Sequence, residues 1–131
     1  MINRTKRRNV IKLFVDDERA APEGWLLAKT SANALTVLKL FHACKVSVDV
    51  LSLDHDLSIT DGNDDTTRCI VNWMCENEWW PDEIYVHTAN SAGEEWLVGT
   101  IQRYAPDKTL KGYGMNFWAT ESGTTSIRHM L

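Results

Sequence analysis

The sequence predicts an α/β domain of the flavodoxin-like type, a three-layer sandwich built on a mostly parallel sheet. Short apolar segments alternate with amphipathic helical segments along the chain. The strand segments are apolar throughout, as is typical of parallel strands with helices on both faces. A chain of 131 residues suits one domain. We expect its core at about residues 10–106, a basic tail at 1–9 and a C-terminal extension at 107–131.

The first third of the chain predicts two strands and a helix. Ile11–Val15 is a β-branched and aromatic run typical of a buried strand. Residues 18–24 contain a proline and a glycine, which predict a loop instead of a full first helix. Trp25–Lys29 indicates a second strand. Ser31 is expected to cap a helix whose apolar residues recur at helical spacing until about Lys45.

The middle of the chain predicts a strand, a polar loop and a second helix. Val46–Leu53 indicates the next strand. Residues 58–65 are polar and are expected to form a loop. Asp65 or Thr66 is then expected to cap a helix, which ends within Asn77–Pro81.

A strand, a helix and a weaker strand complete the predicted alternation. Glu83–His87 resembles the earlier strands. Ser91 with Glu94 matches a capping box at the start of the next helix, which Pro106 limits. Residues 110–118 indicate a final strand, although two glycines weaken that prediction.

The composition of the chain limits the classes of partner that it is expected to bind. The net charge of −4 argues against bulk duplex nucleic-acid binding, and we interpret the basic cluster Arg4–Arg8 as a solvated tail. Three cysteines without paired spacing, and no apolar run of transmembrane length, favour a cytoplasmic location and no membrane partner. Trp79-Trp80 could cover the core or form an oligomer interface, so the oligomeric state stays open.

Acidic and imidazole side chains follow three of the predicted strands. The first strand ends in Asp16-Asp17, the third in Asp54-His55-Asp56, and the fourth in His87. In an open parallel sheet, ligands bind beyond the carboxyl ends of the strands, where the strand order reverses. A single acid at a strand end is often only a turn or helix cap. Acids on two neighbouring strands predict instead that the side chains share one crevice.

Such a crevice favours metal-assisted phosphate chemistry. Clustered carboxylates repel one another unless a cation joins them, and oxygen ligands suit Mg²⁺, or Mn²⁺ if a histidine takes part. The helix predicted to begin at Ser91 directs its free N–H groups and positive dipole end toward the same crevice. Carboxylates, a cation and an anion-binding helix end together indicate a phosphate ligand.

These strand ends resemble the receiver superfamily, in which paired acids follow the first strand and a phospho-acceptor Asp follows the third. Three segments are similar to a narrower family, the cyclic-phosphate processing receiver-like domains: LFVDDERAAP (Leu13–Pro22), SLDHDL (Ser52–Leu57) and HTANSAG (His87–Gly93). Ser58 stands where this family has Gly, and Ser91 where Pro is common. The resemblance implies a receiver-like fold with a reduced first helix. It also implies action on cyclic phosphates such as 2′,3′-cyclic RNA ends or cyclic nucleotides, in RNA repair or phage and bacterial defence.

A metal-dependent hydrolysis assigns a role to each of these residues. The metal would lower the pKa of a bound water, and an imidazole would act as general acid or base. Strand alternation puts Asp54 and Asp56 on one side and His55 on the other. The expected sets are, for the Mg²⁺ or Mn²⁺ ion, Asp16, Asp17 and Asp54; for catalysis, His55, Asp56 and His87; and for the phosphate, Arg19, Thr88, Asn90 and Ser91.

Two other classes of function are compatible with the sequence. A non-catalytic receiver-like module could bind a nucleotide, or be switched by phosphorylation at Asp54 with Lys108 or Lys111 as the cationic partner. An interaction protein could use the six tryptophans as a contact surface, but that reading leaves both acidic strand ends unexplained.

Overall fold

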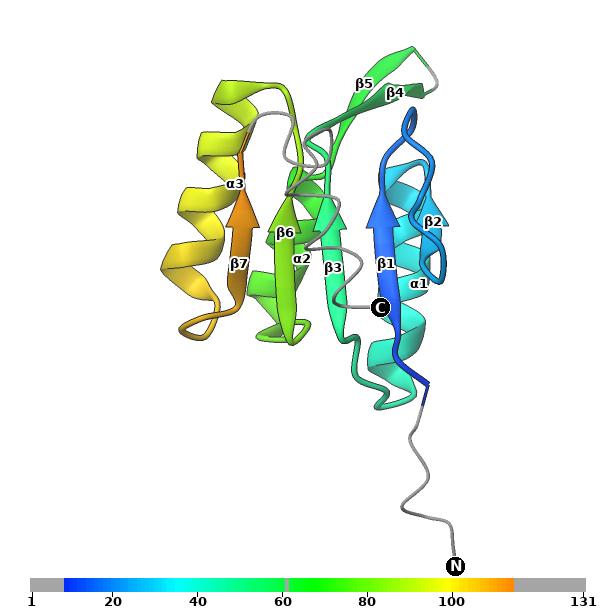
Figure 1. The fold of residues 1–131 in the computed structure, drawn as a ribbon, viewed down its shortest axis with the longest axis vertical. Coiled ribbons are helices and arrows are strands. Elements are labelled where there is room, and N and C mark those ends of the chain that lie inside the picture. The colour runs from blue at the N-terminus through cyan, green and yellow to red at the C-terminus, as the bar shows by residue number, and fades with distance from the viewer. Residues whose placement is uncertain (1–8, 61, 115–131) are drawn as a thin grey trace, which may run out of the picture.

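A five-stranded parallel sheet organises the protein (Figure 1). The computed structural model describes residues 9–60 and 62–114, so nearly all of the predicted basic tail lies outside it. The strand order is β2-β1-β3-β6-β7, the flavodoxin-like order, which confirms the predicted class. The order reverses between β1 and β3. The strands are β1 (Lys12–Val15), β2 (Leu26–Ala28), β3 (Val50–Leu53), β6 (Glu83–Val86) and β7 (Leu110–Tyr113), so the sheet continues past the boundary expected near residue 106.

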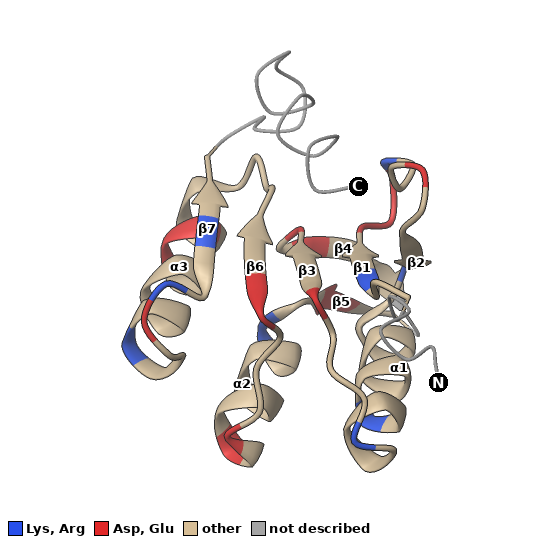
Figure 2. Cartoon of the chain, turned by 60° about the horizontal axis from the view of Figure 1, so that its bottom comes forward, with Lys and Arg blue, Asp and Glu red and all other residues tan. Residues whose placement is uncertain are grey.

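The helices of the described residues all lie on one side of the sheet (Figure 2). They are α1 (Ser31–Ala43), α2 (Arg68–Asn77) and α3 (Ser91–Tyr104). Each one connects two parallel strands, and successive right-handed crossovers in the same direction put helices on the same face. Buried residues from all three helices share one apolar core with β1, β3 and β6. Within the described residues, no helix combines the length and the apolar character that crossing a bilayer requires.

The opposite face of the sheet carries a smaller cluster of Phe14, Trp25 and Val50. In the described stretch between β1 and β2, residues 16–25, the chain forms no helix, which confirms the reduced first helix. The sequence predicted helices on both faces, whereas the described residues supply them to one face only. The physical reason is the loop with Pro22 and Gly24, which places Trp25 where a helix would otherwise pack.

Two helix caps lie one residue earlier than the sequence predicted. Thr30, not Ser31, caps α1, and its side chain accepts a hydrogen bond from the Asn33 N–H at 3.0 Å. Asn90, not Ser91, caps α3, and its Oδ1 accepts from the Gly93 N–H at 2.9 Å. Both cap residues have extended backbone, which the N-cap position requires. The capping box expected at Ser91 is therefore wrong.

A β-hairpin replaces the polar loop predicted at residues 58–65, and that prediction is wrong. Its strands are β4 (Asp56–Thr60) and β5 (Asn63–Thr66), which pair antiparallel. The hairpin stands above the carboxyl ends of β1 and β3 (Figure 1). The dipeptide Asp-Gly at 61–62 is a strong hairpin signal that the polar composition obscured. Gly62 has a φ of 80°, a backbone conformation that favours glycine.

One carboxylate fastens the hairpin to α1. Asp65 in β5 accepts hydrogen bonds from the Ser31 N–H at 2.9 Å and from the Ser31 hydroxyl at 2.5 Å. The Ser31 N–H belongs to the first turn of α1, where the helix itself offers no acceptor. Asp65 therefore acts as a second cap, supplied from a distant part of the chain.

Asp65→Ala is expected to lower the free energy of unfolding by about 1–2 kcal/mol, because it leaves two donors at the start of α1 without their acceptor. Urea unfolding followed by circular dichroism measures the change. Asp64→Ala is the matched control, since Asp64 is the exposed neighbour in β5 and its loss should change stability by less than about 0.5 kcal/mol. Equal effects of the two variants would contradict this role for Asp65.

Candidate functional site

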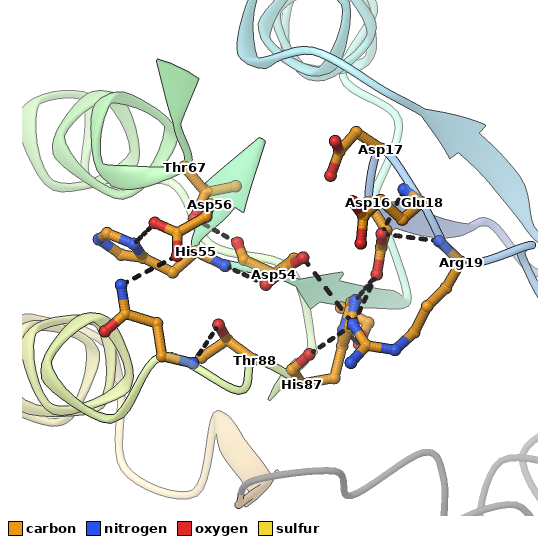
Figure 3. A network of polar contacts seen from close by, with 12 residues as sticks. Asp16, Asp17, Glu18, Arg19, Asp54, His55, Asp56, Thr67, His87 and Thr88 are labelled. Carbon is orange, nitrogen blue, oxygen red and sulfur yellow. Dashed lines mark hydrogen bonds and ion pairs between the residues drawn. The ribbon is translucent and has the colours of Figure 1, made fainter. Parts of the chain in front are cut away.

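Three carboxylates meet beyond the carboxyl ends of β1 and β3. Val15 and Leu53 are paired in the sheet, so Asp16 and Asp54 leave the two strands side by side. Asp16, Asp17 and Asp54 each offer an oxygen atom, and these oxygens lie within 4.8 Å of one another. Figure 3 shows Asp16 and Asp54 turned toward each other. The structure therefore brings together the three residues that the sequence predicted as metal ligands.

Asp16 is a fully buried carboxylate whose two oxygens are both occupied. Its Oδ1 accepts from the backbone N–H groups of Glu18 and Arg19, at 2.8 and 2.9 Å. Its Oδ2 accepts from His87 Nε2 at 3.0 Å and from Arg19 Nη1 at 3.1 Å. Burial alone would raise the pKa of Asp16, but the hydrogen bonds from His87 and from the two backbone N–H groups outweigh it and hold that pKa far below its usual range. Asp16 is thus a permanent negative charge inside the protein.

His87 directly follows β6 and supports Asp16 from the carboxyl end of that strand. Its ring is 1% exposed and stacks on Phe14 with 4.3 Å between the ring centroids. Because Nε2 donates to the ionised Asp16, Nδ1 accepts from the hydroxyl of Ser52, 2.7 Å away. Burial lowers the pKa of His87, against the opposing effect of Asp16, so the ring is neutral at physiological pH. Both ring nitrogens are occupied.

The pKa of Asp54 is shifted in the opposite direction from that of Asp16. Burial, chiefly, and the nearby charge of Asp16 raise its pKa, although a hydrogen bond with the Thr88 side chain and one from the His55 N–H oppose that rise. The Thr67 hydroxyl donates to the Asp54 backbone carbonyl at 2.6 Å and fixes the turn after β3. The folded state therefore disfavours the ionised form of Asp54 relative to a solvated carboxylate.

His55 points away from the three carboxylates (Figure 3). Its Nδ1 lies 2.7 Å from Asp56 Oδ1, and its Nε2 accepts from Arg68 Nε at 2.9 Å. The ring packs against the first turn of α3, where a Cβ added to Gly93 would lie 2.3 Å from the ring. The glycine of the third sequence motif is thus required by the space that His55 fills. Arg68 was missed, since neither its spacing nor its position in α2 links it to a strand end.

Asp56 and Asn90 join the two loops that border the site. The Asn90 amide donates to Asp56 Oδ2 at 2.9 Å, while His55 holds the other carboxylate oxygen. Burial tends to raise the pKa of Asp56, but the hydrogen bonds from Asn90 and His55 and the nearby Arg68 charge lower it overall. Asp56 is exposed and ionised, so of the three residues predicted to be catalytic it alone presents its side chain to the cleft.

An open cleft of about 380 Å³ lies over these side chains. The hairpin forms one wall, and its Ser58 hydroxyl donates to Asp17 Oδ2 at 2.5 Å, a contact that the sequence reasoning missed. His55, His87 and Ser91 do not line the cleft. The lining residues are Asp17, Glu18, Arg19, Asp54, Asp56, Leu57, Ser58, Ile59, Thr88, Ala89 and Asn90.

The fold and the site together define a receiver-like domain, in which paired acids follow the first strand of the sheet and another acid follows the third. Within that class the chain belongs to a particular family: the family model for the cyclic-phosphate processing receiver domain matches residues 11–103. A search of curated proteins found no match. The family membership confirms the resemblance that the three sequence motifs carried.

The opposite pKa shifts of Asp54 and Asp16 predict opposite effects of the same substitution. In metal-free protein, Asp54→Asn should raise the midpoint of thermal unfolding by about 2–4 °C, because it removes a disfavoured charge from the folded state. Asp16→Asn should lower the midpoint, because it removes a charge that the fold stabilises. Calorimetry in EDTA measures both changes. Destabilisation by Asp54→Asn, or stabilisation by Asp16→Asn, would contradict this account of the site.

His87 predicts a pH dependence of stability. Its pKa in the folded state lies below the value of 6.5 that it has in the unfolded chain, so the unfolded chain takes up the proton first as the pH falls. The free energy of unfolding should then decrease below about pH 6.5, by up to about 1.4 kcal/mol per pH unit, and this group should have no effect at higher pH. Urea unfolding between about pH 5 and 8 tests this, with His87→Gln expected to show the shallower slope. Equal slopes would show that His87 does not titrate in this way.

Proposed function

We propose that this protein hydrolyses cyclic phosphates of nucleotides or RNA ends with the help of a divalent cation. The observation that carries the proposal is the convergence of three carboxylates at the carboxyl ends of neighbouring parallel strands. The family membership supports the substrate class, because the family is described as processing cyclic phosphates. The proposal adds the reaction and the cation to that description.

The donor set fits a hard divalent ion such as Mg²⁺ or Mn²⁺. Asp16, Asp17 and Asp54 present only oxygen, and their oxygens are close enough to share one ion. Burial, chiefly, and the neighbouring charge of Asp16 raise the pKa of Asp54, and a cation bound between the carboxylates would oppose both effects. When bound, the cation would supply Lewis-acid neutralisation of the charge on the phosphate.

The residues that line the cleft would bind the phosphate and the attacking water. Arg19, Thr88 and Asn90 line the cleft and in this proposal bind the phosphate, while Ser91 lies outside the cleft. Asp56 can accept a hydrogen bond from the attacking water, since its carboxylate is ionised and open to solvent.

The two histidines support carboxylates in this mechanism instead of exchanging protons with the substrate. His55 acts through Asp56, because its Nδ1 contacts that carboxylate from the side away from the cleft. His87 acts through Asp16, because its Nε2 donates to Asp16 while its own side chain does not line the cleft. Both are positioning residues, since each ring already has a partner at both nitrogens.

The rival functions have less support. A phosphorylation switch at Asp54 expects a lysine at the carboxyl end of the fifth strand. Lys108 precedes β7 and Lys111 lies within it, and the sequence has no lysine after Lys111. An interaction surface built on tryptophan is also less well supported, because every tryptophan among the described residues packs against one of the two apolar cores.

Hydrolysis can be tested with 2′,3′-cyclic AMP, 3′,5′-cyclic AMP and a cyclic dinucleotide, each with Mg²⁺, Mn²⁺ or EDTA. We expect turnover of at least one compound that requires the cation. Asp54→Asn should lower the rate more than about 100-fold, because the variant keeps the shape of the site but loses a ligand charge. Product formation is followed by chromatography.

Asp64→Asn serves as the control, because it removes an exposed carboxylate of the hairpin that does not line the cleft. Circular dichroism checks that Asp54→Asn is folded, so that a loss of turnover can be separated from unfolding. Full activity of Asp54→Asn, or activity that persists in EDTA, would contradict the proposed reaction.

A further inference from the structure

Arg19 occupies the position between the carboxylates where a cation is expected. Its Nη1 lies 3.1 Å from Asp16 Oδ2, 3.8 Å from Asp54 Oδ2 and 3.4 Å from the His87 carbonyl oxygen. Figure 3 shows the guanidinium reaching across to both carboxylates. These contacts make Arg19 the counter-charge of the site in the structure as it stands.

The guanidinium and a divalent ion would compete for the same two carboxylates. Asp16 and Asp54 are two of the three candidate ligands, and all three candidate oxygens fall within 4.8 Å of one another. Two positive groups that share ligands at such distances repel each other strongly. A divalent ion can bind fully only when the Arg19 side chain leaves this position.

The Arg19 side chain is partly exposed and borders the cleft into which it would move. The residue belongs to the helix-free stretch between β1 and β2, and 36% of its side chain is exposed. It also lines the cleft together with Thr88 and Asn90. A guanidinium displaced into the cleft presents a planar set of N–H donors that suits phosphate oxygens.

We propose that Arg19 is a resident counter-cation that the divalent ion displaces, and that the displaced guanidinium then binds the phosphate. Metal and phosphate binding are coupled through this one side chain: the metal releases Arg19, and the phosphate keeps it in the cleft. The inference rests on the proposed metal site and adds that the metal binds before Arg19 binds the phosphate. It predicts that Arg19 weakens metal binding and strengthens phosphate binding. A residue that only fixes Asp16 in place would strengthen metal binding instead.

Mn²⁺ binding measured by electron paramagnetic resonance tests the exchange, with inorganic phosphate as the anionic probe. Without phosphate, Arg19→Ala should bind Mn²⁺ about tenfold more tightly than the wild type, because no side chain has to be displaced. In the wild type, phosphate should tighten Mn²⁺ binding, and in Arg19→Ala that gain should be at least about fivefold smaller. Arg19→Lys keeps the charge, so its Mn²⁺ affinity should stay close to that of the wild type, with a weaker response to phosphate.

Lys29→Ala controls for the general effect of removing a positive charge. Lys29 is exposed and directly follows β2, so it lies at the carboxyl ends of the parallel strands, as the site does. Its loss should change Mn²⁺ affinity by less than about twofold, because solvent and salt screen it. Circular dichroism confirms that each variant is folded.

The outcomes separate this inference from the proposed function. Unchanged or weaker Mn²⁺ binding by folded Arg19→Ala, while the wild type binds Mn²⁺ and turns over a cyclic phosphate, overturns the exchange and leaves the hydrolysis standing. An equal gain from Lys29→Ala also overturns the exchange. Failure of both the wild type and Arg19→Ala to bind Mn²⁺ overturns the metal site and the inference together.

Discussion

The buried negative charge of Asp16 is the interaction on which the site depends. It lies at the end of β1 with no exposure to solvent, and four donors from His87, Arg19 and the backbone keep it ionised. A buried carboxylate without such donors would be protonated or would destabilise the fold. Because Asp16 stays charged, it adds to the effect of burial and raises the pKa of the neighbouring Asp54, and Arg19 is a positive group that lies near both carboxylates.

The two histidines each hold one carboxylate of the site in place. His87 directly follows β6 and holds Asp16, while His55 packs against the first turn of α3 and holds Asp56. Each ring has a hydrogen-bond partner at both nitrogens, and each acts on the cleft only through a carboxylate. This arrangement resembles the way that outer ligands orient the groups that contact a metal or a substrate.

The sequence was sufficient to predict the sheet and the meeting of the acids, and insufficient to predict the contacts around them. Strand ends are readable because apolar runs stop abruptly at Asp16 and Asp54. The Arg68–His55 contact joins α2 to the end of β3, and no local pattern encodes such a pairing. The hairpin was missed because polar composition was weighed above the Asp-Gly signal at 61–62. The role of Arg19 at the carboxylates likewise became visible only from the distances between side chains.

The most direct test of the central claim is a crystal structure of the protein grown with Mn²⁺, with diffraction data collected at a wavelength where manganese scatters anomalously. The account predicts one anomalous peak within coordination distance of Asp16, Asp17 and Asp54, with the Arg19 guanidinium moved into the cleft. A metal peak elsewhere, or none at the three carboxylates with Arg19 still between Asp16 and Asp54, would contradict it.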